Sequence, residues 1–202
     1  MTRVVLASSS QARLSVLLAA GVRPEVIPSN VDESAFSGRP PRDLALSLAE
    51  AKAAAVAGRL GSGLVIGCDS LLEITGSSEL AGAPLGKPAS PLEARSLWQK
   101  MRGQTGTLFT GHCLIDAGTR RAVSDVAATD VVFASPTDQE IDAYVATGEP
   151  LEAAGAFKLE GAGAWFIEEI RGDYTNVIGI SLPLLRKLFT SIGVAVTDLW
   201  NR

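Results

Sequence analysis

Apolar runs of strand length alternate with helix-period apolar patterns along this chain, and that alternation is the feature that most constrains its fold. Residues 3–8, 25–28 and 64–68 are typical of short strands. Residues 43–57 repeat apolar positions with the 3.6-residue period of a helix, and Ser10 is suited to cap a helix that follows the first strand. Because strands that alternate with helices build α/β domains, the sequence predicts an α/β fold.

The second half of the chain continues the alternation and contains one clear helix start. Ser90, Pro91 and Glu93 have the spacing of a capping box with proline at the first helical position. Residues 155–163 are rich in glycine and predict a loop. The strand over residues 64–68 is expected to continue over 71–74, beyond Asp69-Ser70. Further strands are expected at residues 107–115, 122–133 and 165–170. One further helix is expected to begin in residues 137–140, and residues 185–192 mark the final helix.

Length and charge limit the domain count and the partners. A chain of 202 residues is near the upper end of what one hydrophobic core serves, so we expect a single domain over residues 1–202. The net charge of −4 gives no general attraction to nucleic acid or to an anionic membrane. No secretory signal and no apolar stretch of about 20 residues is visible. We therefore expect a cytoplasmic protein without nucleic-acid or membrane partners.

Several familiar catalytic arrangements do not fit the sequence. A Ser or Cys nucleophile needs a histidine base, but His112 is the single histidine and falls in a strand pattern typical of a structural residue. His/Cys spacings for zinc are missing. Residues 82–88 resemble a P-loop, with one residue too few between the glycines and Pro88 in place of Ser or Thr. Cys68 and Cys113 are not arranged as a disulfide framework and are interpreted as buried thiols.

A serine-rich turn is the first candidate for phosphate binding. Ser8 and Ser10 lie between the first strand and the start of the first helix. Free backbone N–H groups, hydroxyls and the positive end of a helix suit such a turn to a phosphate, and Arg13 could contact two phosphate oxygens. The same turn could also be a plain helix cap.

Carboxylates follow the second and third predicted strands. Asp69 comes directly after residues 64–68, and ligands of open α/β sheets lie at the carboxyl ends of strands, so Asp69 is a candidate catalytic group. Asp32 and Glu33 end the loop after the second strand and could hold a divalent cation. Alternatively, Asp69 could be a turn residue bonded to its own backbone, and the acidic loop could simply be solvated.

Two lysines complete the set of candidates. Lys52 interrupts an Ala-rich helix and Lys87 lies in a tight loop between Gly86 and Pro88. Each alone would be an ordinary surface lysine. With the carboxylates and the serine turn they supply what hydrolysis of a phosphoanhydride needs, namely cations for the phosphates, carboxylates for Mg²⁺ and a carboxylate that orients water.

Motifs spread over essentially the whole chain resemble those of the Maf nucleotide pyrophosphatases. Residues 6–13 are similar to the family opening L-A-S-x-S-P-R-R. The remaining motifs occur in the family's order and at plausible spacing: Asp32-Glu33, Leu48-Ala49 with Lys52-Ala53, Gly67-Cys68-Asp69-Ser70, Gly86-Lys87-Pro88, Thr110-Gly111, Ala154-Gly155-Ala156-Phe157 and Asn176-Val177-Ile178-Gly179. This ordered set is far more specific than any one motif.

The resemblance implies both a fold and an activity. The fold would be α/β, with a mixed twisted sheet flanked by helices and two lobes around a deep nucleotide-binding cleft, often as a homodimer. The activity would be that of a nucleoside triphosphate diphosphatase that uses Mg²⁺ or Mn²⁺ to convert a (d)NTP and water into (d)NMP and diphosphate, and that removes non-canonical or modified nucleotides. By position, Asp69 would accept the proton of water and hold metal with Glu33, and the triphosphate would lie among Ser8, Ser10, Arg13, Lys52 and Lys87.

Base preference and cellular role stay open at this point. The resemblance places Glu160 at the nucleobase end of the cleft. Family members that favour 7-methylguanine nucleotides tend to have Glu there, whereas those that favour thymine and uracil nucleotides tend to have Gln. Gln11, Ala12 and Ser70 depart from the family pattern, since Pro, Arg and a Thr or Gln are usual there. Two other functions also remain: a nucleotide-binding regulator of cell division and septum formation with little turnover, and a generic phosphatase that releases orthophosphate.

Overall fold

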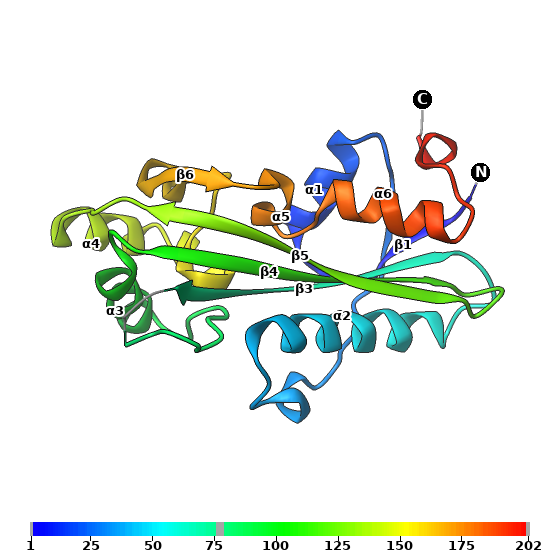
Figure 1. Ribbon diagram of the computed structural model, residues 1–202, viewed down its shortest axis with the longest axis horizontal. Helices are drawn as coiled ribbons and strands as arrows, with labels where there is room; N and C mark the ends of the chain where they lie inside the picture. Colours follow the sequence, from blue (N-terminus) through cyan, green and yellow to red (C-terminus); the bar gives the residue numbers. More distant parts are fainter. Residues whose placement is uncertain (1, 76–78, 201–202) are drawn as a thin grey trace. The chain divides into compact units, whose positions relative to one another are not determined.

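The computed structural model describes residues 2–75 and 79–200. Within these ranges, six strands form one mixed sheet in the order β2-β1-β3-β4-β5-β6, flanked by helices (Figure 1). Strand β1 (Val4–Leu6) runs parallel to β2 (Glu25–Val26) and to β3 (Leu64–Thr75), whereas β5 (Ala122–Phe133) and β6 (Ile167–Arg171) are antiparallel. The predicted α/β class and mixed sheet are confirmed.

The described residues divide into two compact units. Unit 1 contains the chain up to Asp69, Thr110–Ala127 and the residues from Gly179 onward, and unit 2 contains Ser70–Phe109 and Ala128–Ile178. Strands β3, β4 (Thr105–Asp116) and β5 each contribute residues to both units. The single domain over 1–202 and the cleft between two lobes stay predictions.

Unit 1 is built on the parallel part of the sheet. Helix α2 (Pro41–Ala57) lies on one face, and α1 (Gln11–Ala19) and α6 (Leu182–Ser191) lie on the other (Figure 1). Short 3₁₀ turns form at Glu33–Phe36 and Val196–Leu199. One of its core clusters comprises Val5, Ala7, Ala49, Ala53, Val56, Ala57, Val65, Cys113, Ile115 and Ala117.

Small residues let α2 approach the sheet closely. Ala45, Ala49 and Ala53 recur every fourth residue on α2 and are fully buried. A Cβ atom built on Gly67 of β3 would collide with the backbone of Ala49 and Ala53, and one on Gly111 of β4 would collide with the backbone of Ala45. The two glycines therefore leave room for helix backbone, which fixes the height of α2 above the sheet.

Unit 2 has an aromatic core. The ring of Trp98, on α3 (Pro91–Met101), makes edge-on contacts with Phe133, Tyr144 and Phe166 at centroid distances of 5.7, 5.6 and 5.6 Å. Its indole N–H donates to the carbonyl of Ala156 at 2.7 Å, so the buried ring has its polar atom satisfied. The other elements are α4 (Asp138–Ala146), α5 (Tyr174–Ile178) and 3₁₀ turns at Glu149–Glu152, Ala154–Ala156 and Ala162–Phe166.

The structure differs from the sequence-based expectations at three places. At α3, Ser90 caps the N–H of Glu93, but the Glu93 carboxylate accepts from the N–H of Ala89, so the box is not reciprocal. Strand β6 begins at Ile167, because the preceding residues form a 3₁₀ turn. The strand expected over residues 64–68, with its continuation over 71–74, also includes Asp69 and Ser70 and runs unbroken as β3 to Thr75.

The lone histidine and the cysteines of unit 1 are buried, as predicted. His112 is fully buried and bonded through both ring nitrogens to backbone groups. Both thiols are free, and burial raises the pKa of Cys68 and of Cys113 to about 12. In the described part of the chain no helix is both long enough and apolar enough for a membrane span.

Candidate active site

The serine turn and Arg13 form one hydrogen-bonded unit at the start of α1. Ser10 is the N-cap, and its hydroxyl accepts from the backbone N–H of Arg13 at 3.4 Å. The Ser8 hydroxyl accepts from the N–H of Ser10 and from Nη1 of Arg13, both at 3.2 Å. Arg13 Nε also donates to the carbonyl of Gly179 at 2.8 Å. The guanidinium is thus held beside the N-terminus of a helix, where an anion is favoured.

Lys52 bridges the two carboxylates that the sequence singled out. Its Nζ atom lies 2.5 Å from Oδ1 of Asp69 and 2.7 Å from Oε1 of Glu33. The side chains of Lys52 and Asp69 are each 12% exposed, whereas that of Glu33 is 56% exposed. The three come from α2, β3 and the 3₁₀ turn Glu33–Phe36. We call Glu33, Lys52 and Asp69 the acid–lysine cluster.

Asp69 is not a turn residue. It lies inside β3, is buried, and uses its carboxylate to pair with Lys52. It also lies three positions beyond Ile66, which pairs with Leu6 at the end of the shorter strand β1. The sheet register therefore places Asp69 near the point where β1 ends and the serine turn begins, although β3 itself continues.

Asp32 and Glu33 make different contacts, although they are neighbours in sequence. Oδ1 of Asp32 accepts from the N–H and the hydroxyl of Ser34, at 3.0 and 2.7 Å, and caps the 3₁₀ turn. These hydrogen bonds hold the pKa of Asp32 below its usual value. The carboxylate pair expected at Asp32 and Glu33 is therefore replaced by a pair of Glu33 with Asp69, joined through Lys52.

Cys68 precedes Asp69 on β3 and is fully buried. Burial is the main cause of the raised pKa of this thiol, and the charges of Arg13, Asp69 and Lys52 also act on it. Arg13 and Lys52 lower the pKa, whereas Asp69 raises it. The serine turn follows β1, and the N–H of Ala7 donates to the carbonyl of Ile66 at 2.8 Å, so the turn begins beside β3. In unit 1, hydrogen bonds join the predicted residues Ser8, Ser10 and Arg13, and ion pairs join Glu33, Lys52 and Asp69.

Lys87 and Glu160 belong to unit 2. Lys87 is exposed and makes no hydrogen bond or ion pair with residues 2–75 or 79–200. Its neighbour Gly86 accepts at its carbonyl from the N–H of Gly155 at 2.9 Å, so the two glycine motifs adjoin within unit 2. Glu160 is exposed as well, and partial burial raises its pKa while Lys158 opposes that shift. Their roles beside the unit 1 residues stay predictions.

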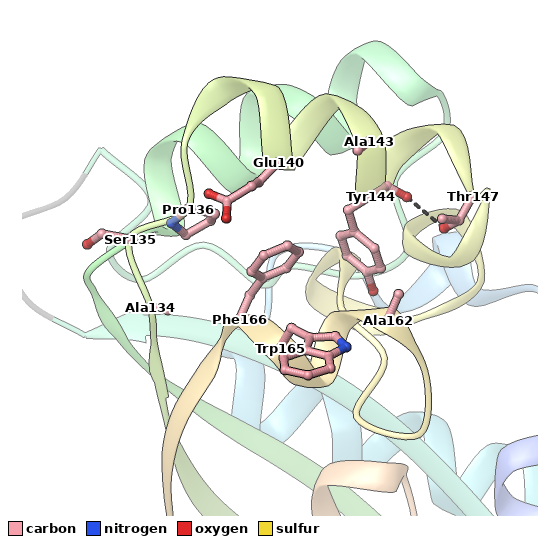
Figure 2. A pocket seen from close by; sticks show the side chains of 10 residues that line it. All are labelled: Ala134, Ser135, Pro136, Glu140, Ala143, Tyr144, Thr147, Ala162, Trp165 and Phe166. Atoms are coloured by element: carbon pink, nitrogen blue, oxygen red, sulfur yellow. Dashed lines mark hydrogen bonds between the residues drawn. The ribbon is translucent and has the colours of Figure 1, made fainter.

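A pocket of about 570 Å³ lies elsewhere in unit 2 (Figure 2). Its wall carries the rings of Tyr144, Trp165 and Phe166, and Trp165 is 86% exposed. None of the predicted site residues lines it. Sequence reasoning gave no signal for this pocket, because its residues come from three separate parts of the chain. These are the segment after β5, helix α4 with its C-cap, and the turn before β6.

A cluster of carboxylates with a lysine, and a helix N-terminus that holds an arginine, are both typical of α/β proteins that bind phosphate groups. Residues 3–192 match the family model described as Maf-like protein. Because the match covers most of the chain, the chain belongs to the Maf-like protein family. This confirms the family resemblance of the motifs.

Curated relatives extend the family match over the full chain. A protein of Streptomyces coelicolor is 54% identical over 200 residues, which cover 98% of this chain and 94% of the relative. A protein of Trichormus variabilis is 49% identical, with 99% and 98% covered, and one of Salinispora tropica is 47% identical, with 99% and 88% covered. Each of the three is named nucleoside triphosphate pyrophosphatase.

Proposed function

We propose that this protein is a nucleoside triphosphate pyrophosphatase that converts a (d)NTP and water into a (d)NMP and diphosphate. The names of its full-length relatives support the reaction class. The observation that carries the proposal is the acid–lysine cluster, which joins Glu33 and Asp69 through Lys52. A carboxylate beside phosphate-binding cations is what water attack on a phosphoanhydride requires.

Asp69 is the proposed general base. The oxygen of a water molecule attacks the α-phosphorus, its proton passes to the Asp69 carboxylate, and the bond from that phosphorus to the α–β bridging oxygen breaks. The bonding electrons leave with the diphosphate. The ion pair with Lys52 keeps Asp69 fixed, and His112 is bonded through both ring nitrogens to other groups, so a carboxylate is the available base.

The donor set of the cluster fits a divalent cation. Glu33 and Asp69 already share one cation, the Lys52 ammonium, so their oxygens converge on one point. Residues 2–75 and 79–200 contain no group of three or more His, Cys, Asp or Glu placed to hold a metal ion. Mg²⁺ is commonly held by one or two carboxylates, with substrate phosphates and water as the other ligands. Glu33 and Asp69 would hold Mg²⁺ or Mn²⁺, which when bound neutralises phosphate charge.

Cations and hydroxyls of this chain are proposed to bind the triphosphate. Arg13, which is held by its bonds to Ser8 and Gly179, would contact phosphate oxygens beside the N–H groups of the α1 terminus. Ser8 and Ser10 would line the same turn. Lys87, whose ammonium has no partner among the described residues, is also proposed to bind the triphosphate.

Glu160 is proposed to read the nucleobase. A guanine presents two donors, N1–H and the exocyclic amine, that a carboxylate can accept together. Uracil and thymine present a donor flanked by acceptors, which an amide satisfies better. The proposed substrates therefore include guanine and 7-methylguanine triphosphates, and the enzyme would remove modified nucleotides. We also propose that it acts in the cytoplasm and forms a homodimer. Sedimentation of the purified protein tests the dimer.

One experiment separates this proposal from its alternatives. The protein is incubated with a panel of nucleoside triphosphates and Mg²⁺, and phosphate is measured with and without added inorganic pyrophosphatase. Phosphate that appears only when pyrophosphatase is added supports diphosphate release. Orthophosphate without it would indicate a generic phosphatase, and nucleotide binding without turnover would indicate a regulator. Either of these results would overturn the proposal.

A further inference from the structure

The segment Gly179 to Ser181 is held at both ends by side chains that are distant in sequence. At one end, the Gly179 carbonyl accepts from Nε of Arg13 at 2.8 Å. At the other, the backbone N–H of Ser181 donates to Nε2 of His112 at 2.8 Å. Ile180 between them is fully buried. All these residues belong to unit 1.

His112 is fixed in one tautomer by these contacts. Because Nε2 accepts a hydrogen bond from a backbone N–H, it carries no proton. The ring proton is therefore on Nδ1, which donates to the carbonyl of Thr110 at 2.9 Å. The ring is fully buried on β4. The bond to Thr110 thus orients the ring, and the bond from Ser181 ties that residue to the central sheet.

The segment needs glycine at its first residue and is fixed as a helix cap at its last. Gly179 has a φ of 118°, a value that side chains other than glycine rarely adopt. Ser181 is the N-cap of α6, and its hydroxyl accepts from the N–H of Leu184 at 3.1 Å. The Gly179 carbonyl lies two residues before the Ser181 N–H that is bonded to His112, and together with the Ser8 hydroxyl it holds the Arg13 guanidinium.

We propose that His112 is a positioning residue for Arg13, acting through Gly179 to Ser181, and so contributes to binding of the triphosphate. The inference rests on the proposed function for the identity of the ligand. A buried histidine with a purely structural role would stabilise the unit whether or not Arg13 is present. A positioning role makes its effect on the substrate depend on Arg13.

A double-mutant cycle tests that dependence. His112→Leu removes both ring contacts, and Arg13→Met removes the guanidinium while keeping most of the stem. With Arg13 present, His112→Leu is expected to lower kcat/KM by about 10-fold or more, mostly through a higher KM, because a displaced binding group costs that much. With Arg13→Met, the same substitution should change kcat/KM by less than about two-fold. An equal loss in both backgrounds would overturn the inference.

Two further variants keep the test decisive if His112→Leu does not fold. His112→Gln can place an acceptor where Nε2 lies and should stay within about three-fold of wild-type kcat/KM. His112→Asn is shorter, keeps a group near Nδ1 but withdraws the Nε2 acceptor, and should show the loss. The reverse order would overturn the positioning role.

Binding of an analogue separates this inference from the proposed function. The probe is a nucleoside triphosphate with a methylene group at the α–β bridge, titrated calorimetrically into each variant. If the wild-type protein neither binds the analogue nor releases diphosphate, the proposed function fails. If it does both but His112→Leu weakens binding equally with and without Arg13, only the positioning role fails.

Discussion

Substitution of Asp69 by Asn separates the chemistry of the acid–lysine cluster from its packing. The amide has the shape of the carboxylate but accepts no proton at neutral pH. Lys52 keeps its contact with Glu33 at 2.7 Å, so its ammonium is not left alone. We therefore expect a stability loss of about 1–2 kcal/mol, as for one weakened hydrogen bond, and not the roughly 3–5 kcal/mol of an isolated buried charge.

The effect on turnover should be much larger than the effect on stability. Loss of a general base costs at least about 10² in rate, which corresponds to roughly 2.7 kcal/mol of transition-state stabilisation. Diphosphate release is measured by the pyrophosphatase-coupled phosphate assay, and folding by thermal unfolding. Asp125→Asn is the matched control, because Asp125 is an exposed residue of unit 1 whose ion pair with Arg42 is 3.8 Å long. It should leave turnover unchanged.

The reasoning is refuted if folded Asp69→Asn protein turns over at a rate within about three-fold of wild type. A loss of activity that merely follows a loss of folded protein would also remove the assignment. The control guards against a general charge effect, since both substitutions remove one carboxylate from the same unit.

Three more outcomes are expected. Excess chelator should abolish diphosphate release, and Mg²⁺ or Mn²⁺ should restore it. Full turnover in the presence of chelator would refute the requirement for a divalent cation. Glu160→Gln should shift kcat/KM from 7-methyl-GTP and GTP toward UTP and dTTP, and four unchanged ratios would remove Glu160 from the site. Since burial raises the pKa of Cys68 and Cys113 to about 12, only roughly 10⁻⁴ of each thiol ionises near pH 8, so a thiol reagent should label the unfolded protein but not the native one.

Local sequence patterns were sufficient for most elements but not for Asp69. The predicted strand–helix alternation, the Ser10 cap and the buried His112 are confirmed. The polar pair Asp69-Ser70 between two apolar runs looks like a turn by residue preference. Pairing with neighbouring strands outweighs that preference and keeps β3 continuous. Lys52 then supplies the partner that a buried carboxylate needs, and spacing along the chain does not reveal such a partner.

The connections around Arg13 also lie beyond local pattern reasoning. Arg13 and Gly179 are 166 residues apart, and His112 and Ser181 are 69 apart. Periodicity predicts which faces are buried, but it contains no information on which distant backbone carbonyl a side chain will reach. The family motifs mark 176–179 as a block, and the structure supplies the physical reason for Gly179.

The glycine motifs on β3 and β4 connect the fold to the site, which Gly67→Ala can test. The new Cβ would meet backbone atoms of Ala49 and Ala53, which cannot rotate away, so α2 must shift. Overpacking of this kind costs about 1–3 kcal/mol. Because Lys52 is on α2, the shift also moves its ammonium from Asp69, and a displacement near 1 Å can cost about 10² in turnover. Gly61→Ala is the control, since a Cβ there meets nothing within 4 Å. Wild-type melting temperature and turnover in Gly67→Ala would show that the close approach of α2 does not hold Lys52 in place.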